Sequence, residues 1–173
     1  LDALKPRLAR SGLSNVQTAA IAHERDDRIK RLAQKMDRVL VDAPCSGTGT
    51  IRRNPDLKWR LKEKELAEIT ALQSTILRSA AQLVKPGGRL VYATCSLLPD
   101  ENEAIANAFT EGSEAFELMP VAPLLQTVLT PQGGAAEDGD ALALELCQGN
   151  FLRLWPHLHQ TDGFFAAVWQ RRM

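Results

Sequence analysis

The stretch L-V-D-A-P-C-S-G-T-G-T occupies residues 40–50, and a second stretch, L-V-Y-A-T-C-S, occupies residues 90–96. In each, an apolar run that predicts a buried strand ends at a cysteine set in a turn. In open α/β sheets, ligands and reacting groups gather at the carboxyl ends of the strands. The two runs therefore predict an α/β sheet with Cys45 and Cys95 at its functional edge.

Helix and strand signals alternate along the rest of the chain. Strands are predicted at residues 16–22, 38–42, 89–94, 116–119, 151–155 and 164–170. Helices are predicted at residues 1–11, within 23–35, across the apolar positions from 66 to 84, and at about 101–110, with loops at 46–60 and 131–140. This alternation predicts a mostly parallel sheet, and the last two strands predict a late antiparallel hairpin.

Two turn signals mark helix boundaries. Lys85-Pro86-Gly87-Gly88 predicts the end of the long helix, and Leu98-Pro99-Asp100-Glu101 predicts the start of the next, where acids favour the helix N-terminus. The third cysteine, Cys147, falls in a stretch of helical character. The chain opens inside a helical pattern without an initiator Met, so we expect it to belong to a longer protein.

The composition is that of one folded domain. The 173 residues are 45% hydrophobic and 24% charged, which excludes a disordered chain. No apolar run approaches the roughly 18 residues of a membrane helix. Three cysteines, an odd number without a small disulfide framework, indicate a reducing compartment. We therefore expect a soluble, cytoplasmic protein.

The net charge is zero, but the charges are unevenly spread. Residues 1–89 hold 18 Lys and Arg against 10 Asp and Glu, whereas the remainder holds 3 against 11. A basic cluster follows the first cysteine motif and comprises Arg52, Arg53, Lys58, Arg60, Lys62 and Lys64. It suggests a site for RNA phosphates, and the alternative is a solvated helix face, because Glu residues interleave with it. Trp59 fits a core position better than a base contact.

The two cysteines have several possible roles. A thiol at a strand end, beside backbone amides, can act as a nucleophile, while the alternative is a small buried apolar side chain. The residues alone do not choose between the two thiols. Asp42, at its strand end, is a candidate to hydrogen-bond or protonate a substrate, or else it caps the next turn. The three His residues show no ligand spacing with the cysteines, so we expect no metal site.

Three motifs together carry a family resemblance. They are D-A-P-C-S-G-T-G-T-I-R-R-N-P-D-L-K-W at 42–59, K-P-G-G-R-L-V-Y-A-T-C-S-L-L-P-D-E-N-E at 85–103, and T-D-G-F-F-A-A at 161–167. The chain resembles the Sun/Fmu family of RNA cytosine-5 methyltransferases. The resemblance implies a Rossmann-like fold with strand order 3-2-1-4-5-7-6 and S-adenosylmethionine as cofactor.

The resemblance also implies a mechanism. In the family, the cysteine matching Cys95 adds to carbon 6 of cytosine, and the cysteine matching Cys45 assists release of the methylated product. The implied partner is RNA, ribosomal rather than transfer RNA, with the target base taken out of its stack. Rival interpretations are a non-catalytic RNA-binding module that kept the fold, and a thiol hydrolase with a His base.

Two cofactor elements of the family are absent from the sequence. The glycine-rich loop and the acid that binds the cofactor ribose are expected before residue 1, so residues 1–173 are expected to form a partial catalytic domain, truncated at the N-terminus, whose missing part completes the sheet. The acid near the adenine has only Asp26 and Asp27 as candidates, and both equally fit a charged surface segment. We expect this chain alone to be weakly stable and to bind the cofactor poorly.

Overall fold

The computed structural model describes residues 3–129 and 136–173. Its strands are β1 (Met36–Asp42), β2 (Val84–Thr94), β3 (Phe116–Met119), β4 (Cys147–Gln148), β5 (Phe151–Leu154) and β6 (Phe164–Arg171). Its α-helices are α1 (Lys5–Ser11), α2 (Asp27–Lys30), α3 (Leu57–Arg60), α4 (Glu63–Ala81), α5 (Glu103–Glu111), α6 (Val121–Leu129), α7 (Ala136–Glu145) and α8 (Pro156–His159). Two short 3-10 helices, η1 (Thr48–Thr50) and η2 (Pro99–Glu101), follow the cysteine motifs. None of the described helices is long and apolar enough to cross a membrane.

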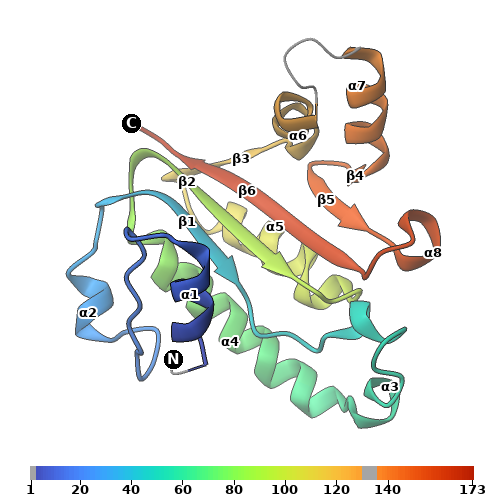
Figure 1. Ribbon diagram of the computed structural model, residues 1–173, viewed down its shortest axis with the longest axis horizontal. Helices are drawn as coiled ribbons and strands as arrows, with labels where there is room; N and C mark the ends of the chain where they lie inside the picture. The colour runs from blue at the N-terminus through green and yellow to red at the C-terminus, as the bar shows by residue number, and fades with distance from the viewer. Residues whose placement is uncertain (1–2, 130–135) are drawn as a thin grey trace.

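The strands form one mixed sheet in the order β1-β2-β6-β5-β4, and β3 also pairs with β6 (Figure 1). β1 and β2 are parallel, while β6 runs antiparallel to β2, β3 and β5. The resemblance implied the strand order 3-2-1-4-5-7-6. In this sheet β1, β2, β6 and β3 take the places of its strands 4, 5, 7 and 6, in that order. The predicted α/β fold with a late antiparallel strand is confirmed.

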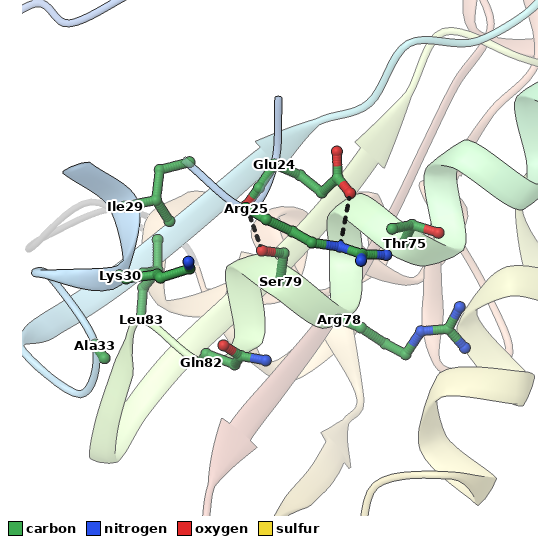
Figure 2. Close-up of a pocket in the computed structure, with 10 residues that line it drawn as sticks. All are labelled: Glu24, Arg25, Ile29, Lys30, Ala33, Thr75, Arg78, Ser79, Gln82 and Leu83. Atoms are coloured by element: carbon green, nitrogen blue, oxygen red, sulfur yellow. Dashed lines mark hydrogen bonds and ion pairs between the residues drawn. The ribbon is translucent and has the colours of Figure 1, made fainter. Parts of the chain in front are cut away.

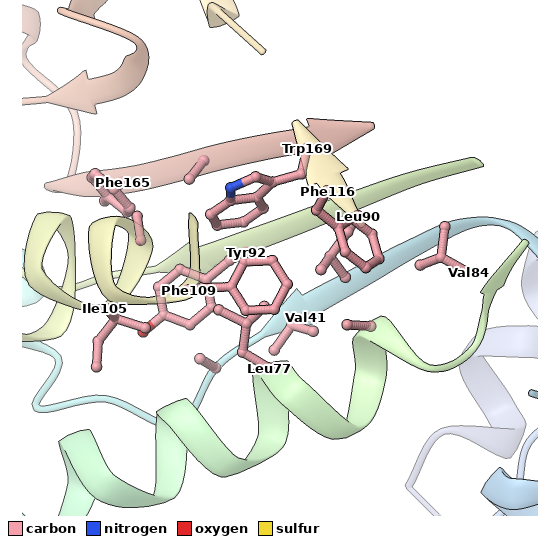
Figure 3. Close-up of a cluster of buried hydrophobic side chains, with 14 residues drawn as sticks. Val41, Leu77, Val84, Leu90, Tyr92, Ile105, Phe109, Phe116, Phe165 and Trp169 are labelled. Atoms are coloured by element: carbon pink, nitrogen blue, oxygen red, sulfur yellow. The ribbon is translucent and has the colours of Figure 1, made fainter. Parts of the chain in front are cut away.

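Helices α4 and α5 cover one face of the sheet. In α4, Gln73, Leu77 and Ala81 recur every four residues, so they share one face of the helix, and all three are buried. Leu77 and Ala81 belong to a hydrophobic core that includes Tyr92, Phe165 and Trp169 (Figure 3). The centroids of the Trp169 ring and of the Phe109 ring in α5 lie 4.9 Å apart. The indole nitrogen of Trp169 donates a hydrogen bond to Thr110 Oγ1 at 2.9 Å. This core fixes the strand ends that carry the cysteines.

The predicted strand at residues 16–22 is wrong. These residues are exposed and form no regular secondary structure. A strand requires hydrogen bonds to a neighbouring strand, and no described strand pairs with this segment. β1 is consequently the edge of the sheet, and its Leu40 is 67% exposed.

Three other sequence predictions are corrected. The long helix ends at Ala81, before the predicted stop at residues 85–88, because the carbonyls of Gln82 and Leu83 accept hydrogen bonds from the chain that enters β1. The predicted loop at 131–140 lies partly outside the described residues, and from Ala136 it is helix α7. Cys147 pairs with Leu152 in a short strand rather than lying in a helix.

Candidate functional site

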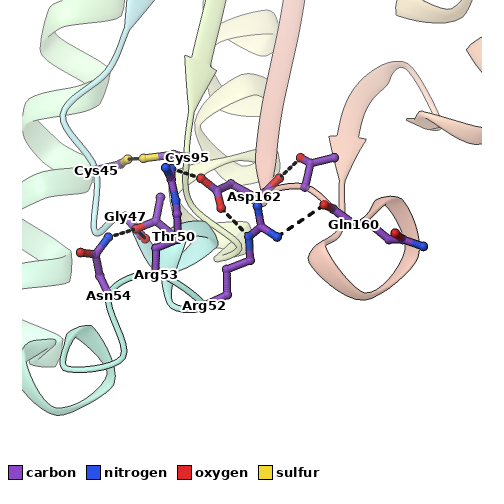
Figure 4. Close-up of polar contacts among 10 residues, drawn as sticks. Cys45, Gly47, Thr50, Arg52, Arg53, Asn54, Cys95, Gln160 and Asp162 are labelled. Atoms are coloured by element: carbon purple, nitrogen blue, oxygen red, sulfur yellow. Dashed lines mark hydrogen bonds and ion pairs between the residues drawn. The ribbon is translucent and has the colours of Figure 1, made fainter.

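The two cysteines of the sequence motifs lie side by side. Their Sγ atoms are 3.4 Å apart (Figure 4). β1 ends three residues before Cys45, and β2 ends directly before Cys95. Because β1 and β2 are parallel neighbours, their carboxyl ends meet at one edge of the sheet. The placement expected from the two motifs is therefore what the structure shows.

A crossing of three backbones holds the cysteine turns together. Gly49 N donates to the carbonyl of Cys95 at 2.8 Å, and Gly163 N donates to the carbonyl of Gly49 at 2.9 Å. A Cβ atom on Gly49 would lie 2.4 Å from Gly163 O and 2.7 Å from Cys95 O, so only glycine fits there. This crossing brings the T-D-G-F-F segment at residues 161–165 to the site, although no site role was predicted for that segment.

The environment distinguishes the two half-buried thiols. Burial, with the hydrogen bond to Cys95 as the next cause, raises the pKa of the Cys45 thiol from 9.0 to about 12. At neutral pH, Cys45 therefore keeps its proton. A protonated Cys45 is able to donate to the Cys95 sulfur across the 3.4 Å contact.

Asp42 ends β1 and is exposed. Among the residues that the structure describes, its carboxylate forms no ion pair and no hydrogen bond to the following turn. The alternative role as a turn cap is thus not what the structure shows. Asp42 presents a carboxylate to the same sheet edge as the thiols.

A buried carboxylate that sequence reasoning missed lies under both turns. Glu101 is fully buried and accepts hydrogen bonds from Ser46 and from Ser96, the residues that directly follow the two cysteines. The sequence suggested only that this acid favours a helix start. In the structure α5 begins later, at Glu103, which leaves Glu101 free to turn inward. The charge of Glu101 adds to the burial that raises the pKa of Tyr92.

Two predicted RNA-binding arginines lie close to the crossing. Arg52 Nε is 2.8 Å from Asp162 Oδ1, and Arg53 also pairs with Asp162 (Figure 4). Arg52 further contacts the carbonyl of Gln160 at 3.4 Å. These arginines hold the pKa of Asp162 below its ordinary value. Both cations remain half or more exposed, so they can also contact solvent or a phosphate.

The other members of the predicted basic cluster follow along the chain, with Lys58 and Arg60 in α3, Lys62 at the start of α4 and Lys64 in its first turn. Lys58 Nζ is 4.7 Å from the centre of the Trp59 ring. The prediction that Trp59 belongs to the core is wrong, because 77% of it is exposed. Its short helix packs no aromatic ring into the sheet. The side chain of Arg60, which was predicted to bind RNA, lies outside the described part of the structure.

The acids predicted to contact adenine lie apart from the thiols. Asp26 caps α2 and pairs with Arg28, whose hydrogen bonds lower the pKa of Asp26, and Asp27 pairs with Lys30 at 2.9 Å. A pocket of about 440 Å³ opens between this segment and α4 (Figure 2). Ser79 in its wall donates to the carbonyl of Glu24 at 2.5 Å. Neither the cysteines nor Asp42 line this pocket.

Comparison with known proteins places this geometry in a family. The model of the family described as 16S rRNA methyltransferase RsmB/F matches residues 1–170. This chain belongs to the RsmB/F family. The thiol pair thus belongs to a member of a family that is named for rRNA methyltransferase activity. The prediction of an RNA methyltransferase family from the sequence motifs is confirmed.

Several curated proteins are similar to the chain. Ribosomal RNA small subunit methyltransferase B of Salmonella arizonae is 47% identical over 112 residues, which are 62% of this chain and 25% of that protein. The protein of the same name from Yersinia pestis is 39% identical over 172 residues, which are 96% of this chain and 35% of that protein. The RsmB/F chain thus spans about a quarter to a third of the length of these relatives.

Solved structures agree with the assignment. The match to the crystal structure of PH0851 covers 98% of this chain and 34% of the PH0851 chain, with a TM-score of 0.78 and 35% sequence identity. A methyltransferase homolog protein from Pyrococcus horikoshii matches 98% of this chain and 49% of its own, with a TM-score of 0.69 and 30% identity. NSun6 from Pyrococcus horikoshii with SFG, at 24% identity and a TM-score of 0.70 over 98% of this chain and 38% of its own, supports the fold.

Proposed function

We propose that this chain carries the catalytic thiols of an enzyme that methylates carbon 5 of cytosine in RNA, with small-subunit ribosomal RNA as substrate. The observation that supports it most strongly is the 3.4 Å contact between Cys45 and Cys95 at the carboxyl ends of β1 and β2. The family description and the names of the relatives supply the substrate class. In this proposal the chain is part of a larger catalytic domain.

The chemistry follows from the weakness of cytosine carbon 5 as a nucleophile. A Cys95 thiolate adds to carbon 6, forming a C–S bond and turning carbon 5 into an enamine-like nucleophile. S-adenosylmethionine supplies the methyl group as an electrophile. Loss of the carbon 5 proton to a base then drives the C–S bond to break, which returns the thiolate to Cys95.

The state of the two thiols supports this division of roles. Cys45 keeps its proton at neutral pH because burial and Cys95 raise its pKa, so it is able to donate a hydrogen bond to a Cys95 thiolate. A donor aimed at the Cys95 sulfur stabilises negative charge there and favours Cys95 as the nucleophile. Once Cys95 is bonded to the base, Cys45 lies beside the adduct, where it assists elimination.

Other side chains take supporting parts in the proposal. Asp42 hydrogen-bonds the cytosine edge or the cofactor, since its exposed carboxylate has no partner among the described residues. Asp26 and Asp27 are the candidate contacts to the adenosine, and their present pairing with Arg28 and Lys30 means that such contacts would have to compete. Of these acids, only Asp42 has no ion-pair partner among the described residues.

The RNA is held beside the thiols in the proposal. Arg52 and Arg53 contact phosphates with Lys58 and Arg60, and the target base is flipped out toward the two thiols because carbon 6 is unreachable in a stack. The free thiols of the chain are compatible with the cytoplasm, where disulfides are kept reduced.

Trapping with RNA that contains 5-fluorocytosine tests the proposal. In 5-fluorocytosine, carbon 5 carries fluorine in place of the proton that elimination removes. The C–S bond therefore does not break, and the enzyme stays covalently attached to the RNA. With S-adenosylmethionine and the complete protein of which this chain forms part, we expect an adduct for the wild type and for Cys45→Ala, and none for Cys95→Ala. With unmodified RNA, Cys45→Ala should accumulate an adduct that the wild type resolves.

The outcomes separate the competing functions. An adduct with transfer RNA alone would move the substrate from ribosomal to transfer RNA. RNA binding without an adduct for the wild type would replace the catalytic proposal by a non-catalytic RNA-binding module. An adduct that persists in Cys95→Ala would contradict the assigned nucleophile.

A further inference from the structure

One carboxylate connects the two cysteine turns. Glu101 is fully buried, and its Oε1 accepts hydrogen bonds from Ser46 N at 2.8 Å and from Gln73 Nε2 at 3.0 Å. Its Oε2 accepts hydrogen bonds from the hydroxyls of Ser46 and Ser96. Four donors from both turns and from α4 thus converge on a single side chain.

Three of these four donors belong to the residues that directly follow the two cysteines. Ser46 directly follows Cys45, and Ser96 directly follows Cys95. Their hydroxyls also lie 3.2 Å apart, below the pair of sulfur atoms that are separated by 3.4 Å. The residue after each cysteine is therefore held by the same carboxylate.

Glu101 is itself firmly held. Its own carbonyl accepts a hydrogen bond from the Tyr92 hydroxyl at 2.7 Å, in the middle of the core. The next residue, Asn102, donates to the carbonyl of Ser96 at 2.9 Å and accepts from the Thr94 hydroxyl at 2.5 Å. Glu101 is thus fixed to β2 and is able to transmit that rigidity to the turn after β1.

We propose that Glu101 is a positioning residue that sets the separation of the Cys45 and Cys95 thiols by holding the residue after each of them. The proposal rests on the proposed function in that this separation matters to a two-thiol reaction. Glu101 does not touch the substrate side of the site, because its side chain is buried beneath the turns.

The donor pattern explains why a carboxylate is required. Both carboxylate oxygens accept hydrogen bonds, whereas a glutamine has one accepting oxygen and one donating NH₂ group. In Glu101→Gln, the NH₂ group must face either two N–H donors, Ser46 N and Gln73 Nε2, or the two serine hydroxyls. At least one pair of contacts is lost or reversed, while size and shape are kept.

Thiol alkylation tests the proposal without any RNA. The rate at which iodoacetamide modifies Cys45 is followed by peptide mass analysis as a function of pH. If Glu101→Gln separates the thiols, Cys45 loses the partner that helps to raise its pKa and forms thiolate more readily. We expect about a tenfold faster modification of Cys45 at pH 8, the effect of losing one hydrogen bond. Cys95→Ala, which removes the partner directly, should give a similar increase.

A double-variant cycle distinguishes positioning from general loosening. If Glu101 acts on Cys45 through the thiol pair, Glu101→Gln should add nothing to Cys95→Ala. If the substitution only exposes Cys45 to water, the two effects multiply, and the proposal is overturned. Asp100→Asn, an exposed neighbour in η2, is the matched control and should leave the rate unchanged.

Two further measurements complete the test. Ser96→Ala removes one donor and should shift the Cys45 rate in the same direction by a smaller factor, which keeps the proposal testable if Glu101→Gln does not fold. In the complete protein, Glu101→Gln should slow adduct formation at saturating RNA by about 10- to 100-fold without weakening RNA binding. Absence of any wild-type adduct would overturn the proposed function, while the alkylation cycle would still decide the role of Glu101.

Discussion

Gly163 N donates a hydrogen bond to the carbonyl of Gly49 at 2.9 Å, which joins the turn after Cys45 to the turn that leads into β6. Gly49 N in turn donates to the carbonyl of Cys95. The three sequence motifs that resemble one family therefore meet at one point.

Substitution of Gly49 by alanine should destabilise the chain. The added Cβ would lie within 3 Å of two backbone oxygens, Gly163 O and Cys95 O, which cannot move without breaking the crossing. We expect a loss of about 2–4 kcal/mol in the free energy of unfolding, measured by denaturant titration. Gly112→Ala, whose Cβ would lie 3.2 Å from Ala108 O, is the milder control. Equal losses in the two variants would contradict the crowding argument.

The sequence predicted the edge of the sheet on which the two cysteines lie. Apolar runs that end at Cys45 and Cys95 predicted that both thiols follow the carboxyl ends of strands, whereas their contact depends on the pairing of β1 with β2, which the structure shows. β3 was likewise predicted at the residues where it lies, and β6 to within one residue. Local patterns succeed where the periodicity of a strand and its turn signals agree.

Long-range contacts could not be predicted in the same way. The segment 16–22 has strand periodicity, but periodicity does not supply a pairing partner. Glu101 and Asp162 look like surface acids in the sequence, and only the fold shows that one is buried and the other faces two arginines. Trp59 illustrates the reverse case, since an aromatic side chain on a short helix need not reach the core.

The pairing of Asp162 with Arg52 and Arg53 should make stability depend on pH. The arginines lower the pKa of Asp162 below its ordinary 3.8, so the paired carboxylate stabilises the fold above about pH 4 and this contribution is lost as the pH falls further. Asp162→Asn should therefore melt at a lower temperature than the wild type at pH 7, with the gap closing below pH 4. In an Arg52→Gln, Arg53→Gln background the gap should be absent at every pH.

The same pairing should restrain RNA binding. Asp162 neutralises part of the charge that Arg52 and Arg53 offer to phosphates. Asp162→Asn should tighten binding of single-stranded RNA by about threefold to tenfold at low salt, with the gain shrinking as salt is raised. Fluorescence anisotropy at several salt concentrations measures this. Weaker binding by the variant would mean that Asp162 positions the arginines for RNA instead.

Truncation of Trp59 and truncation of Trp169 should have very different effects on the free energy of unfolding. Trp59 is 77% exposed, so Trp59→Ala should change the free energy of unfolding by less than about 0.5 kcal/mol. Trp169 is fully buried, and Trp169→Ala should cost about 3–5 kcal/mol. If Trp59 stacks on a base, its removal should weaken RNA binding about tenfold. A large loss of stability in Trp59→Ala would contradict its exposed position.

The open edge at β1 should limit the stability and the solubility of the chain on its own. Leu40 is 67% exposed beside an unpaired strand edge, a combination that favours association. We expect a low melting temperature and concentration-dependent light scattering, and Leu40→Lys should reduce the scattering while changing the melting temperature little. A sharp melt at high temperature together with tight cofactor binding would contradict this expectation.

The position of β6 bears on how the protein is made. β6 pairs with β2, β3 and β5, yet it is the most C-terminal strand of the described chain. During synthesis, the earlier strands leave the ribosome before the strand that joins them exists, so the sheet closes only after residues 164–171 emerge. The central strand is thus synthesised after all the other described strands, and a truncation that removes residues 164–171 removes the centre of the sheet rather than its margin.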